Sequence, residues 1–322
     1  MPEDYIYAVT RIHIREKYLL NKGEMDSLAS ARDFREALSM LASKGWDASL
    51  VSGRDVEALI NREYEKTWEL IAEAAGQIEE LNILRRTRDF HNLKAAIKLV
   101  YTGGPEQNWA PFFLQYGLIE QERIIKAAEA CDFTLLPEYL SKAGKEAWEV
   151  LIDTGNGQLC ETVIDRAALE ALDAEGKMSK SPLLKRYALF TVDMDNIQAA
   201  LRCHLLGRDR NFLERVITNG GTLDRKGLIN AALGDDSEIG GFLSNTPYAD
   251  AALDILAFER WRNDELIRLI CPYASVISGV EPLAAYILAR GNEISMVRLI
   301  LGSKAVGLSE DSVKERLGLT YV

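Results

Sequence analysis

The sequence contains one short motif twice: "RDFHNLKAAIK" from Arg88 to Lys98, and "VDMDNIQAALR" from Val192 to Arg202. When Asp89 is aligned with Asp193, each stretch reads as an aspartate, two residues, an asparagine and an aliphatic side chain. Apolar residues at helical spacing follow in both. The two motifs lie 104 residues apart. A motif repeated at such a distance indicates that the chain is built from related units.

The same offset of 104 residues holds well beyond the motif and without a gap. The pairs that it relates are Glu57 with Glu161, Asn61 with Asp165, Asn92 with Asn196, Gly103 with Gly207, and Gly117 with Gly221. A third, fainter copy follows in "GNEISMVRLILG", where Glu293 replaces the aspartate and Met296 replaces the asparagine. Upstream of this third copy, Glu259 lies four residues before Asn263, as Glu57 lies four residues before Asn61.

Helical patterns fill most of the chain between these positions. Apolar residues recur at three- and four-residue spacing, and alternating strand patterns bounded by turn residues are scarce. The sequence has only 8 prolines, and no rhythm of strands and crossover helices is visible. We therefore predict an all-α chain with an N-terminal helix in residues 1–30, followed by three similar helical units in residues 31–131, 132–235 and 236–322.

Composition excludes several kinds of function. The formal net charge is −11, and no basic run is present, so we expect no nucleic-acid binding. The 4 cysteines and 3 histidines are scattered, without the paired spacing of a metal site, and we expect no metal or other cofactor. The N-terminus carries acidic residues instead of an apolar signal sequence. No apolar run is long enough to span a bilayer, which predicts a soluble protein without direct membrane insertion.

The repeated motif is interpreted as a structural clamp. Each acid is predicted to begin a helix and to cap its free N–H groups, and each asparagine lies one turn later on the same face. The asparagine can then bond to the helix that carries Glu57 or Glu161. A pair of carboxylates for acid–base catalysis is the alternative, but Met296 in the third copy disfavours it. The predicted clamp residues are Glu57, Asn61, Asp89, Asn92, Glu161, Asp165, Asp193, Asn196, Glu259 and Glu293.

A second short stretch supports a different hypothesis. Lys177 to Ser181 reads "KMSKS", which matches the phosphate-binding loop of one class of aminoacyl-tRNA synthetases. Two lysines and two serine hydroxyl groups can hold pyrophosphate, so a nucleotide-using transferase built on this loop is the alternative function. However, no upstream His-Ile-Gly-His motif or Rossmann pattern accompanies it. A polar loop between helices, closed by Pro182, is the simpler interpretation.

Taken in order, these features resemble the C subunit of V-type and A-type rotary ATPases, the family of the eukaryotic d subunit. That family opens with a Tyr-x-Tyr-Ala-x-x-Arg helix and carries Asp-x-x-Asn-Leu helices and a Gly-Gly turn. Toward its end it has Gly-x-x-Pro-Leu, Glu-Ile-x-x-x-Arg and a C-terminal Tyr-Val. The matching residues are Tyr5 to Arg11, Asp89 to Leu93, Asp193 to Ile197, Gly220 to Leu223, Gly279 to Leu283, Glu293 to Arg298, and Tyr321 with Val322. Met296 departs from the pattern, since the family more often has asparagine there, and Lys177 to Ser181 is not a family feature.

The resemblance implies a funnel of three helical units around a pseudo-threefold axis. It implies a cytoplasmic protein, peripheral to the membrane, that sits on the rotor ring of proteolipid subunits and receives the D and F subunits of the central stalk. The chain would have no catalytic site of its own. It would couple ATP hydrolysis or synthesis to the transport of H⁺ or Na⁺. The residues that contact stalk or ring are not indicated.

Overall fold

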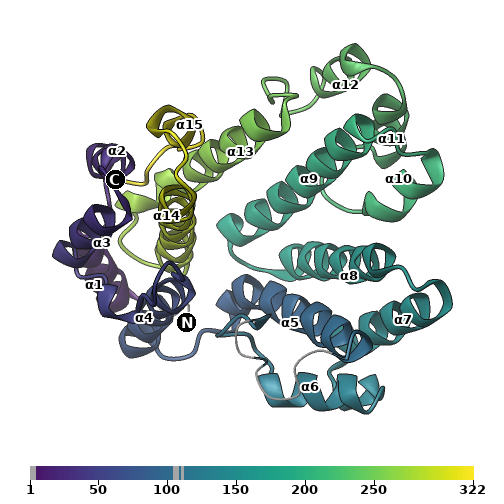
Figure 1. The fold of residues 1–322 in the computed structure, drawn as a ribbon, viewed down its shortest axis with the longest axis horizontal. Helices are drawn as coiled ribbons and strands as arrows, with labels where there is room; N and C mark the ends of the chain where they lie inside the picture. The colour runs from purple at the N-terminus through teal and green to yellow at the C-terminus, as the bar shows by residue number, and fades with distance from the viewer. Residues whose placement is uncertain (1–4, 104–108, 110–111) are drawn as a thin grey trace. The chain divides into compact units, whose positions relative to one another are not determined.

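The computed structural model describes residues 5–103, 109 and 112–322, and this part of the chain is helical without a β-strand (Figure 1). The all-α prediction is confirmed. Residues 1–4 of the predicted N-terminal segment lie outside the described residues. The α-helices are α1 (Ile6–Glu16), α2 (Lys22–Ser30), α3 (Phe34–Ser43), α4 (Glu57–Ala75), α5 (Ile83–Tyr101), α6 (Gln121–Glu129), α7 (Glu138–Thr154), α8 (Gly157–Met178), α9 (Pro182–Leu205), α10 (Arg210–Val216), α11 (Arg225–Leu233), α12 (Asp236–Leu243), α13 (Ile255–Ile270), α14 (Glu281–Val306) and α15 (Glu310–Lys314).

The helices gather into two compact units. The first contains the chain up to Glu79, Ser181–Leu183 and Leu256–Val322, and the second contains Glu80–Lys180 and Leu184–Ile255. The first unit therefore joins the two ends of the sequence. The predicted boundaries at residues 31, 132 and 236 concern sequence repeats and remain predictions.

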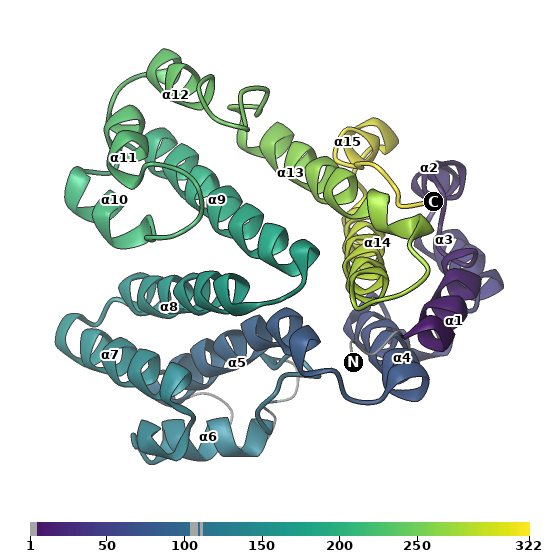
Figure 2. The same cartoon turned by 180° about the vertical axis from the view of Figure 1, so that it is seen from behind.

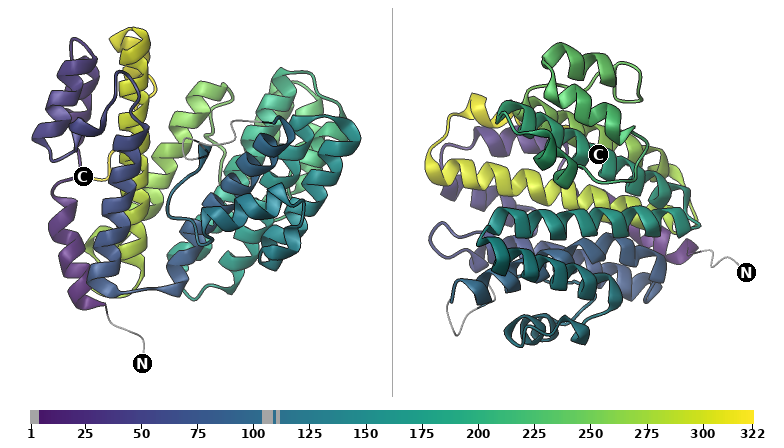
Figure 3. Two further views of the ribbon diagram at one scale, coloured as in Figure 1. Left: turned by 60° about the horizontal axis from the view of Figure 1, so that its bottom comes forward. Right: turned by 90° about the vertical axis from the view of Figure 1, so that its right-hand side faces the viewer.

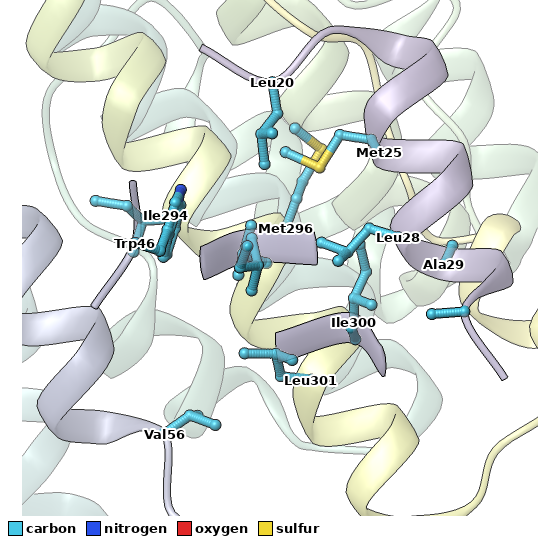
Figure 4. Close-up of a cluster of buried hydrophobic side chains, with 14 of the residues drawn as sticks. Leu20, Met25, Leu28, Ala29, Trp46, Val56, Ile294, Met296, Ile300 and Leu301 are labelled. Carbon is cyan, nitrogen blue, oxygen red and sulfur yellow. The ribbon is translucent and has the colours of Figure 1, made fainter. Parts of the chain in front are cut away.

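Helix α14 is the central element of the first unit. Its sequence is apolar around most of its circumference, and such a helix is stable only when neighbours cover it on all sides. Helices α1, α3 and α4 pack against it, and Figure 3 lets the reader follow α1 and α4 alongside. The buried cluster in Figure 4 joins Leu20, Met25 and Trp46 to Met296 and Ile300 of α14. The core of this unit thus joins Leu20 to Ile300, which lie 280 positions apart in the sequence.

Apolar clusters among the described residues hold the helices of the second unit together. One lies among α5, α6, α7 and α8, where α8 packs against both α5 and α7. Another lies among α9, α10 and α11 (Figure 2). Gly176 of α8 has no room for a side chain, because a Cβ there would overlap with Ala188 of α9. This glycine lets the two helices approach closely.

The three helices that carry the repeated motif end alike. Helices α5, α9 and α14 are each followed by a glycine with left-handed backbone geometry, Gly103, Gly207 and Gly307, with φ of 62°, 59° and 77°. A left-handed glycine is a common way to end a helix, because other residues meet a steric penalty there. Each glycine lies eleven residues after Asn92, Asn196 or Met296, and this common position has a direct structural cause.

Gly307 gives a test of this helix end. We expect Gly307→Ala to lower the free energy of unfolding by about 1 kcal/mol, because an added Cβ meets no neighbouring atom and only the backbone strain remains. Gly291→Ala, inside the same helix and also in open space, should instead stabilise by about 0.5–1 kcal/mol. Urea titration of both variants measures the difference. Equal effects of the two substitutions would refute this explanation of the helix end.

Candidate functional site

Asp89 lies in the interior of α5, fully buried, and binds the chain that follows the helix. Its Oδ1 accepts hydrogen bonds from the backbone N–H groups of Leu118 (2.8 Å) and Ile119 (3.1 Å), and its Oδ2 accepts one from the Tyr139 hydroxyl (3.1 Å). Burial raises the pKa of Asp89 above its usual value, while these three donors favour the charged form. The carboxylate thus holds the segment before α6 against α5.

Asn92 holds the same segment at a second point. Its Nδ2 donates to the carbonyl of Leu114 (2.9 Å), and its Oδ1 accepts from the N–H of the same residue (2.7 Å). A glycine is required between the two points, because a Cβ at Gly117 would overlap with the Asp89 carboxylate. The guanidinium group of Arg85 adds bonds to the carbonyls of Tyr116 (3.0 Å) and Gly117 (2.7 Å).

The second copy of the motif repeats this arrangement on α9. Asp193 Oδ1 accepts from the N–H groups of Thr222 (2.8 Å) and Leu223 (3.2 Å). Its Oδ2 accepts from the hydroxyls of Thr222 (2.6 Å) and Tyr248 (2.8 Å). Asn196 exchanges two bonds with the backbone of Thr218, at 2.8 and 3.1 Å. A Cβ at Gly221 would overlap with Asp193, as one at Gly117 would with Asp89.

The third copy binds a different segment. Glu293 of α14 is buried and accepts a hydrogen bond from the N–H of Leu20 (2.6 Å), in the chain between α1 and α2. Arg290, one turn earlier, donates to both Glu293 and Glu63 of α4, and lies 5.0 Å from the centre of the Trp46 ring. Met296 has no amide and packs in the apolar core. This copy therefore joins α14 to the N-terminal helices.

The structure corrects the expected geometry of the motif. The prediction that Asp89 and Asp193 begin helices is wrong, since α5 begins at Ile83 and α9 at Pro182. The predicted partner of the asparagines is also wrong, because Asn92 and Asn196 bond to the backbone of Leu114 and Thr218 and not to the helices that carry Glu57 and Glu161. The role of the motif residues as rigid clamps remains a proposal.

The other predicted clamp residues lie elsewhere on the helices. Glu57 of α4 pairs with Arg298 of α14 (2.7 Å), Glu161 of α8 with Lys98 of α5, and Asp165 of α8 with Lys94 of α5 (2.7 Å). These pairs are largely exposed, so each contributes about 1 kcal/mol at most. Asn61 and Glu259 are half-buried on α4 and α13.

Residues Lys177 to Ser181 form the end of α8 and the turn into α9. Lys177 pairs with Asp173 of the same helix (2.5 Å), Ser179 follows the last residue of α8, and Ser181 is buried. Among the described residues, no cluster of three or more histidine, cysteine, aspartate or glutamate side chains could hold a metal ion. In the same ranges no helix combines the length and apolar character needed to cross a membrane.

His13 forms a polar link within the first unit that the sequence did not indicate. Its Nδ1 lies 2.7 Å from Glu16 Oε2, and its Nε2 lies 3.0 Å from the carbonyl oxygen of Val276. A carboxylate and a carbonyl both accept, so the doubly protonated ring satisfies both. Burial lowers the pKa of His13, but the bonds to Glu16 and Val276 outweigh this and raise it above 6.5 overall.

Comparison with known proteins gives consistent matches over most of the chain. Residues 8–316 match the model of the family described as ATP synthase (C/AC39) subunit. The C subunit of the V-type ATP synthase of Thermus thermophilus is 24% identical over 98% of this chain and 99% of its own length. The C subunit of the V-type sodium ATPase of Enterococcus hirae is 24% identical over 81% of each chain. The C subunit of the A-type ATP synthase of Haloquadratum walsbyi is 25% identical over 96% of each.

The two-point clamp on α9 predicts a sharp effect of Asn196→Asp. The substitution keeps the side-chain shape but removes the donor to the Thr218 carbonyl and places two acceptors face to face. We expect a loss of about 2–3 kcal/mol in the free energy of unfolding. Asn219→Asp, on the exposed side of the same loop, should change it by less than about 0.5 kcal/mol. Thermal melts that shift equally for both variants would show that the hydrogen bonds of the Asn196 amide do not contribute to stability.

The His13 link predicts a pH-dependent contribution to stability. Because the folded-state pKa is raised, the stabilisation is complete below pH 6.5 and is lost as the pH rises through the folded value. His13→Ala should therefore lower the melting temperature more at about pH 5.5 than at about pH 8.5. A destabilisation that is constant across this range, or larger at high pH, would contradict the imidazolium assignment.

Proposed function

Because the chain belongs to the ATP synthase (C/AC39) subunit family, we propose that it is the non-catalytic component that joins the central shaft of a rotary ATPase to the membrane rotor ring. The D and F subunits of the central stalk are its partners on the shaft side, and the ring of proteolipid subunits is its partner on the membrane side. It would lie on the cytoplasmic face and take part in coupling ATP hydrolysis or synthesis to transport of H⁺ or Na⁺. The match over residues 8–316 is the observation that carries this proposal.

The local structure supports a mechanical role. A part that transmits torque must not deform under load, and its loops must be fixed as firmly as its helices. The Asp89 and Asp193 carboxylates each fix a loop at two consecutive N–H groups, and Asn92 and Asn196 fix the same loops through paired bonds. We propose that the three related units form a funnel with approximate threefold symmetry, in which these clamps keep each unit rigid.

The alternative of a nucleotide-using transferase gains no support from Lys177 to Ser181. The ammonium group of Lys177 is held by Asp173, and the stretch ends one helix and leads into the next. A phosphate loop of the synthetase type uses both lysines, and one of them is already engaged by a carboxylate here. We therefore retain the adapter as the proposed function.

Reconstitution of the ATPase with and without this chain tests the adapter role. We expect the complex without the chain to hydrolyse ATP but to pump few or no ions, because the soluble head is no longer connected to the ring. Adding the purified chain back should restore pumping. Measuring ATP hydrolysis and ion uptake on the same vesicles separates the two activities. Full pumping by a complex that lacks the chain would end the adapter proposal.

A further inference from the structure

Helix α1 has apolar residues on both of its faces. Ala8, Val9 and Ile12 are buried, and the helix packs on α4 and α14. On the outward side, Tyr7 and Ile14 are 69% and 54% exposed, and Tyr18, just beyond the helix, is 66% exposed. A surface helix is normally polar on its outward side, and a group of exposed large apolar side chains marks an interaction site.

Two arginines contact the tyrosine rings on this outward side. The guanidinium of Arg11 lies 5.9 Å from the centre of the Tyr7 ring, and that of Arg15 lies 6.0 Å from the centre of the Tyr18 ring. Both distances are within the range of cation–π attraction. Tyrosine and arginine are, with tryptophan, enriched among the residues that dominate binding energy in protein interfaces, and stacked pairs lose little freedom on binding. We call Tyr7, Arg11, Ile14, Arg15 and Tyr18 the α1 face.

A cavity of about 280 Å³ adjoins the α1 face within the first unit, with Arg15 and Tyr18 in its wall. The same wall contains the cations Lys44, Lys66 and Arg290. The cavity is large enough to admit one or two side chains from another protein. Lys44 pairs with Glu24, and Lys66 and Arg290 pair with Glu63. The cation that a ligand group meets first in this wall is therefore Arg15.

The carboxylates of that wall are already paired. Glu63 binds Arg290 and Lys66, Glu69 binds Arg62, and Glu73 binds Arg11 at 3.1 Å. Among the described residues, Arg15 has its contact with the Tyr18 ring but no carboxylate partner. The α1 face is therefore a cationic and aromatic surface on a chain whose net charge is −11. Complementarity calls for an acidic partner here.

We propose that the α1 face is the docking site for an acidic amphipathic helix of another subunit of the ATPase. The apolar side of that helix covers Ile14 and the tyrosine rings, and its carboxylates pair with Arg15 and compete with the exposed Glu73 for Arg11. One acidic side chain enters the cavity beside Arg15. The inference rests on membership in the ATPase subunit family. It does not require that this partner be the shaft or the ring, so its failure leaves the proposed adapter role standing.

A protein partner fits better than an anionic membrane surface. The net charge of −11 on the whole chain disfavours its approach to an anionic bilayer, whereas a single helix meets mainly the local charge of the α1 face. A bilayer also presents headgroups at a nearly flat surface. A side chain that projects from a helix can enter the cavity beside Tyr18 and Arg15.

Photo-crosslinking in the intact complex tests the site directly. A benzophenone amino acid replaces Tyr18, and a matched variant carries it at Ile152 of α7, which is also an exposed apolar position, at 55%. We expect the variant at position 18 to give a strong crosslink to one subunit, in a segment with at least two acidic residues within two helical turns. Crosslinking no stronger than at position 152, or crosslinks to lipid or to a basic segment, would overturn the proposal.

Reversal of the charge at Arg15 measures the electrostatic contribution to binding of the partner. We expect Arg15→Glu to weaken binding of the purified chain to a complex that lacks it by about tenfold or more at low salt. Lys145→Glu on α7, where the side chain is 75% exposed, changes the net charge equally and should leave binding within about twofold. If the thermal melt shows that Arg15→Glu fails to fold, Arg15→Gln and Tyr18→Ser take its place in the binding measurement. Wild-type binding by all the folded α1-face variants would refute the proposal.

Discussion

A carboxylate buried inside a helix must find hydrogen-bond donors, and this constraint organises the second unit. Asp89 and Asp193 are fully buried in the interiors of α5 and α9, where the backbone N–H groups of their own helices are already bonded. Leaving such a charge unpaired would cost several kcal/mol. The following loop must therefore return to each helix and present two consecutive N–H groups. A glycine must lie at the closest approach, which explains Gly117 and Gly221 together.

The third copy shows how a change of two residues redirects the same constraint. Glutamate at position 293 has a longer side chain than aspartate, and it reaches the N–H of Leu20 and the guanidinium of Arg290. Methionine at position 296 removes the amide and fills part of the core instead. The network through Glu63 and Arg290 then ties α4 to α14, so the two ends of the sequence form one unit.

Much of this could be predicted from sequence, because the helical periodicity and the repeat are encoded locally. The all-α fold, the related motifs and the glycines at matching positions follow from spacing alone. The bonding partners of Asp89 could not be predicted from the sequence. The helical pattern continues upstream of Asp89 through Arg85 and Arg86, so the sequence does not show where α5 begins or that Asp89 lies in its interior. The Glu63–Arg290 pair was also missed. The sequence does place Arg290 and Glu293 three residues apart in a stretch rich in apolar residues, which indicates a buried ion pair but does not identify Glu63 as a partner.

Hydrogen exchange at the clamped loops tests the central claim that buried carboxylates fix the loops to the helices. In the wild-type chain, the N–H groups of Thr222 and Leu223 should exchange nearly as slowly as those inside α9, although they belong to no helix. In Asp193→Ala these two groups should exchange much faster, while Leu118 and Ile119 on Asp89 stay protected. Rapid exchange at Thr222 and Leu223 in the wild-type chain would contradict the account.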